Sequence, residues 1–229
     1  MNEEMLKIRK DIERLHPANV NEVIPLYPGI ELCYLTLSSD PLSVQHKAMP
    51  HMIQINYCKA GQMVWEMKNG NRIYLNPGDF SLHTMKACTD SVIRFPNGIY
   101  QGLTVCIDLQ EAAGNPPEPL KNSSIFETIL PEKFCQNDHP VFLAGNEQTE
   151  TIFSAFYNQP EMLKLPYQRI KVLELLLYLS KIAFIPQNKL TEYQSELIEN
   201  IHKIHDQLLQ QMEQRITIEE LSKQYLINP

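Results

Sequence analysis

The chain has 229 residues, 43% of them hydrophobic, which suits one or two folded domains with a sizeable core. Its formal net charge of −7 argues against a broad nucleic-acid-binding surface within these residues. No apolar run approaches the roughly 20 residues that a membrane helix needs. Residues 1–13 are charged and lack the apolar core of a signal peptide, so we expect a cytoplasmic protein without membrane contact.

The five cysteines favour neither a disulfide framework nor a zinc site. Their number is odd, their spacing is wide, and the sequence has no Cys-x-x-Cys. We expect reduced cysteines that pack as small hydrophobic side chains. They are Cys33, Cys58, Cys88, Cys106 and Cys135.

The stretch from Met52 to His83 predicts four short strands joined by tight turns. Within it, Ile53, Ile55 and Tyr57 alternate with polar residues, which is the period of a strand with one buried face. An Asn-Gly pair and an Asn-Pro-Gly-Asp turn suit the tight turns between the later strands. The whole stretch predicts an antiparallel barrel or sandwich wall. Further strands are expected in residues 30–37, 91–95 and 99–109, with an extended segment in 24–29 and a polar loop in 38–50.

From Glu147 onward the sequence contains no glycine, and apolar residues follow helical spacing. Residues 148–158 and 167–184 are expected to form helices. The apolar residues of the second helix cover on the order of 200°, about twice what a one-sided surface helix needs. We expect one face to pack on the chain's own barrel and the other to form a homodimer. The alternative is that both faces pack within one chain. The predicted dimer interface is Ile170, Leu173, Leu177 and Phe184.

A further amphipathic helix is expected in residues 192–214, and a complete helix start follows it. Thr217 is the expected N-cap, and Glu220, three residues later, closes a capping box. Leu221 occupies one position of a hydrophobic staple. The pair Asn-Pro at 228–229 has the residue types of another helix start. A long helix, a break, a short capped helix and a new helix start form the layout of a helix-turn-helix unit.

The order of these parts resembles that of the AraC-type transcription regulators. The strands with their Asn-Gly hairpin and Pro-Gly-Asp turn resemble the cupin-like effector-binding barrels of that family. Residues 216–229, Ile-Thr-Ile-Glu-Glu-Leu-Ser-Lys-Gln-Tyr-Leu-Ile-Asn-Pro, strongly resemble the opening of its DNA-binding domain. Leu221 and Ile227 match core positions there. The family usually has alanine where Ser222 stands and often glycine where Leu226 stands, and the recognition helix and the second helix-turn-helix unit are missing.

The resemblance implies an α+β fold, with an N-terminal cupin-like antiparallel β-barrel followed by α-helices and a partial helix-turn-helix. The implied parts are an effector-binding barrel in residues 1–146, a helical dimerisation region and linker in 147–189, and an incomplete DNA-binding domain in 190–229. The implied function is transcription regulation by a homodimer that senses a small-molecule effector. Because residues 191–229 hold seven acidic residues against three basic ones, we expect this chain itself to bind DNA weakly or not at all.

The resemblance also implies an effector pocket inside the barrel. Small barrels can hold one ligand among apolar and aromatic side chains with a few polar groups. Trp65, the only tryptophan, lies in the middle of a predicted strand between two methionines. The alternative is that Trp65 and these methionines are ordinary core residues. The candidate effector-binding residues are Tyr57, Trp65, Tyr74, Arg94 and Tyr100.

The rival interpretation is a stand-alone cupin-like sensor or a metal-dependent cupin enzyme. Such an enzyme needs histidines and a carboxylate that converge on one metal ion. His46 and His51 are five residues apart with a proline between them, and His83 is alone on its strand. His202 and His205 have a spacing that suits a metal, but they flank an apolar helical stripe and are expected to pack at an interface. We therefore expect no metal, no cofactor and no enzymatic activity.

Overall fold

The computed structural model describes residues 20–38, 41–68, 70, 72–136, 140–182, 204, 207 and 217–225. The chain divides into two compact units, Met1–Ala183 and Phe184–Pro229, and each is described by itself. Within the described ranges, no helix combines the length and the apolar character that crossing a bilayer requires.

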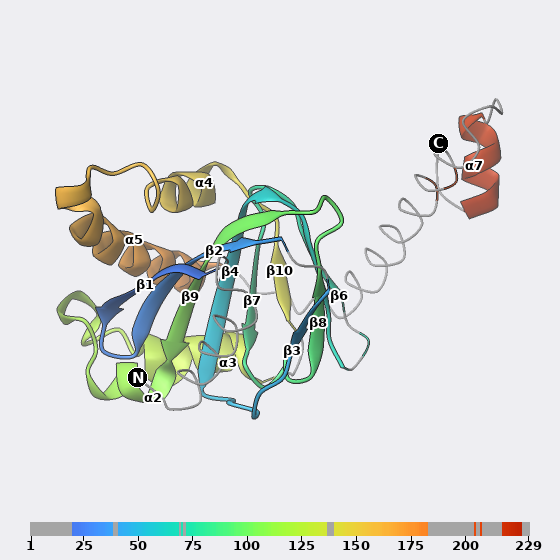
Figure 1. The fold of residues 1–229 in the computed structure, drawn as a ribbon. Coiled ribbons are helices and arrows are strands. Elements are labelled where there is room, and N and C mark those ends of the chain that lie inside the picture. The colour runs from blue at the N-terminus through green and yellow to red at the C-terminus, as the bar shows by residue number, and fades with distance from the viewer. Residues whose placement is uncertain are drawn as a thin grey trace. The chain divides into compact units, whose positions relative to one another are not determined.

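A six-stranded antiparallel sheet forms the centre of the first unit (Figure 1). In spatial order, its strands are β1 (Val20–Tyr27), β2 (Ile30–Leu37), β9 (Tyr100–Asp108), β4 (Met52–Gly61), β7 (Phe80–Thr84) and β10 (Val141–Leu143). The pairing of β4 with β9 shifts register between Cys58 and Ala60, so Lys59 is an extra residue in β4 and forms a β-bulge.

A four-stranded antiparallel sheet packs on one face of the first sheet. Its strands are, in spatial order, β3 (Leu42–Val44), β8 (Ser91–Arg94), β5 (Met63–Glu66) and β6 (Arg72–Leu75). Buried side chains of both sheets meet in one cluster, which we call the inter-sheet core. Its buried members are Leu37, Leu42, Met49, Met52, Cys58, Met63, Trp65, Met67, Ile73, Leu75, Met85, Cys88, Ile93, Phe95, Tyr100 and Cys106.

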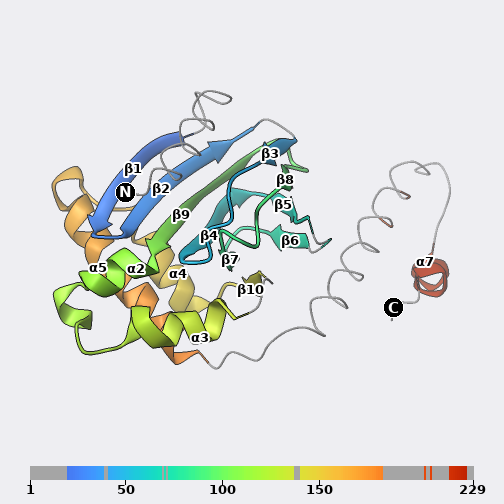
Figure 2. The ribbon, with the colours of Figure 1, turned by 90° about the horizontal axis from the view of Figure 1, so that it is seen from below.

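Helices cover the other face of the six-stranded sheet (Figure 2). They are α2 (Leu109–Gly114), α3 (Leu130–Phe134), α4 (Glu147–Ser154) and α5 (Glu161–Lys181), with a 3₁₀ turn at Glu118–Leu120 and a π-helical turn at Ile125–Ile129. Phe153 of α4 stacks on Tyr57 of β4 with ring centroids 4.2 Å apart, and it lies 5.3 Å from the ring of Phe80 in β7. The six-stranded sheet is therefore covered on both faces.

The predicted α+β fold class is confirmed, with antiparallel strands in two sheets that are followed by helices. The first clear predicted strand, residues 30–37, coincides with β2. The glycines of the two predicted turns, Gly70 and Gly78, have φ angles of 86° and 93°. These values lie in the left-handed region, which glycine adopts without steric cost.

Some elements differ from the predictions for physical reasons. Residues 24–29 were expected to be merely extended, but most of them belong to β1, which is an edge strand and therefore tolerates Pro25. The short strand β3 lies inside the expected polar loop. Helix α5 begins at Glu161 rather than Tyr167, because Pro166 is accommodated inside the helix near its N-terminus, where it removes a single backbone hydrogen bond.

The described part of the second unit centres on α7 (Ile218–Tyr225). Both hydrogen bonds of the expected capping box are present. The Thr217 N–H donates to Glu220 Oε2 at 2.8 Å, and the Glu220 N–H donates to Thr217 Oγ1 at 3.3 Å. Two hydrogen bonds from Thr217 lower the pKa of Glu220. The bond from the Thr217 backbone has the larger effect, and the bond from its side chain has the smaller one. Leu221 is half-buried, whereas Ile227 lies outside the described residues.

Candidate functional site

The central strands of the six-stranded sheet point alternate side chains to two different buried layers. On β4, Tyr57 faces the helices and stacks on Phe153, whereas Met52 and Cys58 belong to the inter-sheet core. Successive side chains of a strand point to opposite faces. Gln54 and Asn56 therefore point to the inter-sheet side, together with Met52 and Cys58.

Five polar side chains form a continuous patch on this inner face, which we call the inner polar patch. In the strand register, Asn56 lies opposite Ser81 of β7 and Thr104 of β9. One row along, Gln54 lies opposite His83 of β7. Four of the five residues are at most 4% exposed, and Gln54 is half-buried. The patch is thus a group of polar side chains on the inner face of the six-stranded sheet, within a largely apolar interior.

The hydrogen bonds within the patch leave several atoms without a partner. The Thr104 hydroxyl donates to Asn56 Oδ1 at 2.8 Å, and Gln54 Nε2 donates to the Cys106 sulfur at 3.8 Å. Among the described residues, Asn56 Nδ2, Ser81 Oγ and both ring nitrogens of His83 are buried without a hydrogen-bond partner. Buried polar atoms in folded proteins are nearly always paired, so each of these exceptions needs a physical reason.

His83 is the most informative member of the patch. Its ring packs edge-on against Trp65, with ring centroids 4.7 Å apart and an interplanar angle of 88°. Burial, and to a lesser degree the charge of His46, lowers the pKa of His83 to about 3. The imidazole is therefore neutral at physiological pH, with one nitrogen able to donate and the other able to accept a hydrogen bond. The indole N–H of Trp65 donates to Ser91 Oγ at 2.7 Å.

The five sequence-predicted effector residues lie in three different places. Trp65 and Tyr100 belong to the inter-sheet core, and the Tyr100 hydroxyl donates to the Tyr57 carbonyl oxygen at 3.0 Å. Tyr57 faces the helices on the other side of the sheet. Tyr74 and Arg94 both pair with Val64, one residue out of step with Trp65, so they lie on the outer face of the small sheet. Only Trp65 and Tyr100 are brought together with the inner polar patch, and effector binding by all five stays a prediction.

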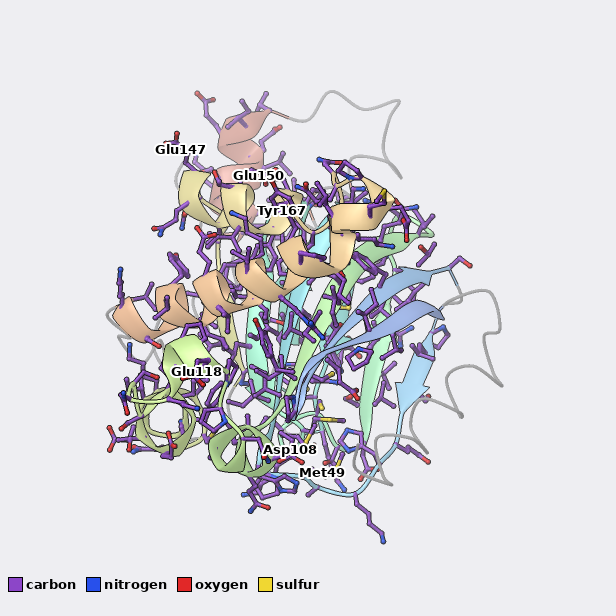
Figure 3. The ribbon with its side chains drawn as sticks, turned by 90° about the vertical axis from the view of Figure 1, so that its left-hand side faces the viewer. Met49, Asp108, Glu118, Glu147, Glu150 and Tyr167 are labelled. Atoms are coloured by element: carbon purple, nitrogen blue, oxygen red, sulfur yellow. The ribbon has the colours of Figure 1, made fainter. Side chains whose placement is uncertain are left out.

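Three of the four predicted dimer residues, Ile170, Leu173 and Leu177, belong to α5, the long helix that crosses the front of Figure 3. Ile170 is 61% exposed and Leu177 is 44% exposed, while Leu173 is half-buried. Phe184 lies outside the described residues. The other apolar stripe predicted for this helix consists of Val172, Leu176, Leu179 and Ala183, with Leu175 at its edge. All of these are buried within the unit except Ala183, which lies outside the described residues.

The histidines considered for a metal site are separated by the fold. His46 lies beside the Cys88 sulfur, with His46 Nε2 3.4 Å from it, and His51 lies 4.0 Å from the Asp108 carboxylate. In the part of the chain that the structure describes, no group of three or more His, Cys, Asp or Glu side chains could hold a metal ion. His202 and His205 lie outside that part. None of the five cysteines, all of which are described, forms a disulfide.

No model of a protein family matches the sequence, and no curated protein matches it. Among solved structures, ToxT from Vibrio cholerae is similar over 87% of this chain and 72% of its own, with 9% identity and a TM-score of 0.43. The AraC-like transcriptional activator CuxR is similar over 90% and 69%, with 10% identity and a TM-score of 0.41. The ethanolamine utilization protein Q of Salmonella typhimurium shares 11% identity at a TM-score of 0.27; the match covers 35% of this chain and spans only 58% of that protein's length.

We expect the His83 imidazole to stay neutral in the folded protein down to about pH 4, because burial lowers its pKa to about 3. In the unfolded chain the same ring takes up a proton near pH 6.5. Protonation of His83 in the unfolded chain therefore has little effect on the free energy of unfolding above about pH 6.5. Below that pH it lowers the free energy of unfolding by roughly 1.4 kcal/mol per pH unit until the pH reaches about 3. Urea unfolding at pH 7 and pH 5 measures it. Wild type should lose about 2 kcal/mol more than His83→Gln over this interval.

Direct observation of the ring by NMR provides the control for that measurement. The imidazole signals of His83 in the folded protein should show no protonation step between pH 8 and pH 5. A protonation step near pH 6.5 in the folded state would contradict the burial of His83 in a site that disfavours its charged form.

Proposed function

We propose that this chain is the effector-sensing and dimerisation portion of an AraC-type transcription regulator that acts in the cytoplasm, together with the start of its DNA-binding domain. The support comes from the chain's own residues: an antiparallel barrel, a helix with an exposed apolar stripe, and a C-terminal segment that resembles the opening of that family's DNA-binding domain. No catalytic role is part of the proposal.

The observation that carries the sensing function is the inner polar patch. Four of its buried polar atoms have no partner among the described residues, in the barrel interior where an effector would bind. A ligand with hydrogen-bonding groups would supply the missing partners. The patch contains no side chain that is ionised at neutral pH, because its members are amides, hydroxyls and the neutral His83. We therefore favour a neutral polar effector.

The surroundings of the patch suit an adaptable binding site. The inter-sheet core contains Met49, Met52, Met63, Met67 and Met85. Methionine side chains are flexible and polarisable, so they can repack around ligands of different shapes. Trp65 touches the His83 ring from the opposite sheet and offers an apolar surface beside the inner polar patch. An effector with a polar edge and an apolar face would match both surfaces.

We expect Ser81→Ala to separate ligand binding from folding stability. The substitution removes a buried hydroxyl that lacks a partner, so the unliganded chain should gain about 1 kcal/mol of unfolding free energy. The affinity for an effector should fall about tenfold, because one hydrogen bond to the ligand is lost. The ligand is found by a thermal-shift screen of neutral polar metabolites, and its affinity is measured by calorimetry and by Trp65 emission.

The matched control is Ser180→Ala, whose hydroxyl donates to the Leu176 carbonyl oxygen on α5 and lies outside the patch. It should leave the affinity unchanged. A ligand that binds Ser81→Ala as tightly as wild type, without any change in Trp65 emission, would place the effector elsewhere and remove the main support for the sensing function.

The regulator and a stand-alone cupin-like sensor differ in what the gene encodes after Pro229. The proposal expects the reading frame to continue into a basic amphipathic helix and a second helix-turn-helix unit. This chain by itself should bind DNA weakly or not at all, since residues 191–229 are acidic. The gene sequence, together with fluorescence anisotropy on a labelled duplex, measures both. A stop codon after Pro229 would favour the sensor.

Homodimerisation through α5 is part of the same proposal. The stripe with Ile170 and Leu177 is exposed, while the opposite stripe packs inside the unit. We expect Ile170→Asp combined with Leu177→Asp to lower the dimer affinity by on the order of a hundredfold or more, because charges would be buried in the interface. Sedimentation equilibrium measures the mass. Thr151→Asp, at an exposed position of α4, should stay dimeric, and a wild type that is monomeric at micromolar concentration would rule out the dimer.

A further inference from the structure

Helix α5 ends without the glycine that commonly closes a helix. Its last residue is Lys181, and the C-cap Ile182 has φ −57° and ψ 130°, an extended conformation rather than a left-handed one. The sequence contains no glycine from Glu147 onward, so no glycine is available for the usual left-handed stop. The last four carbonyl groups of a helix have no partner within it. Those of α5 therefore need hydrogen-bond donors from another part of the chain.

A single side chain of α3 supplies such donors (Figure 2). The Lys133 ammonium donates to the carbonyl oxygens of Leu179 at 3.2 Å and Ile182 at 3.0 Å, and also to that of Ser180. An ammonium group has three N–H donors, and here three carbonyl oxygens accept from it. Its positive charge also lies at the negative end of the helix dipole. We call this arrangement the α3–α5 latch.

The latch connects the end of α5 to a strand of the inner polar patch. Leu130 and Phe134 of α3 are buried and anchor this short helix in the interior. Helix α3 contacts β7, the strand that carries Ser81 and His83. Lys133 itself is half-buried, so water competes only partly for its carbonyl partners. A shift of β7 would therefore act on α3 and, through Lys133, on the end of α5.

We propose that Lys133 is a positioning residue, which fixes where α5 ends and passes changes at β7 to that point. The end of α5 lies directly before the boundary of the second unit, which begins at Phe184. That unit contains the segment that resembles the opening of a DNA-binding domain. The regulatory role of Lys133 rests on the proposed function, because it takes β7 as a strand that the effector contacts. The capping of α5 rests on the contacts of Lys133 alone.

Hydrogen exchange of the full chain, followed at the amides of residues 180–182, tests the latch. The Ile182 N–H donates to the Tyr178 carbonyl oxygen at 3.2 Å and reports on the last turn. In Lys133→Met, these amides should exchange at least about tenfold faster than in wild type, because three carbonyl groups lose a partner and the turn opens more often. Lys133→Arg should restore part of the protection, since a guanidinium keeps the charge but spreads its donors in one plane.

The matched control is Lys181→Met, because Lys181 is an exposed lysine in the last turn of the same helix. It should leave the exchange of Ile182 unchanged. The amides of β6, in the other sheet, should keep their wild-type rates in both variants. Three results would each overturn the latch: wild-type rates at residues 180–182 in Lys133→Met, an equal increase in Lys181→Met, or an equal increase throughout β6.

A double-mutant cycle with Ser81→Ala tests the connection to β7. This substitution removes a buried hydroxyl that lacks a partner among the described residues. We expect it to slow the exchange of residues 180–182 about threefold when Lys133 is present, and to have no effect in Lys133→Met. The same effect in both backgrounds would overturn the connection. These measurements use neither effector nor DNA, so a chain that binds no effector would contradict the proposed function but not the latch.

Discussion

The two-sided burial of β4, β7 and β9 is the constraint on which the other features of the first unit depend. One face of these strands is covered by helices, with Phe153 of α4 against Tyr57 and Phe80, and the other face forms one side of the inter-sheet core. A strand with a solvated face can place polar side chains there without cost. These strands have no such face over most of their length, so Asn56, Ser81, His83 and Thr104 are buried and need partners. The inner polar patch exists because five of their inward positions are polar nonetheless.

The elements of the barrel could be predicted from the sequence because their signals are local. Turn residues such as Gly70 and Gly78, and alternation such as that in residues 53–57, depend only on neighbouring positions. The capping box between Thr217 and Glu220 is local in the same sense, and both of its hydrogen bonds are present. Residues 123–145 lack such signals. The short helical turns and the strand β10 in this segment could not be predicted from the sequence pattern.

The functional side chains were harder to predict, because alternation says which residues share a face but not what covers that face. Ile53, Ile55 and Tyr57 were interpreted as the one buried face, and this left Gln54 and Asn56 on an assumed solvent side. The second sheet covers that side, so the polar residues became the informative ones. Conversely, Tyr74 and Arg94 are aromatic and charged residues on strands, but their register with Val64 places them outside the barrel. A polar residue at every second position of a central strand was the signal that could have revealed the patch.

The same two-sided burial connects the patch mechanically to the helices. Tyr57 and Phe80 lie on β4 and β7, the strands that carry Asn56 and Ser81, and both rings pack on Phe153 of α4. The four buried atoms of the inner polar patch that lack a partner among the described residues cost roughly 4–12 kcal/mol at about 1–3 kcal/mol each, which is large beside a domain stability of about 5–15 kcal/mol. A ligand that supplies the missing hydrogen bonds therefore stabilises one arrangement of these strands strongly. Because α4 packs on the opposite face of the same strands and also contacts α5, that arrangement would also influence the position of α5.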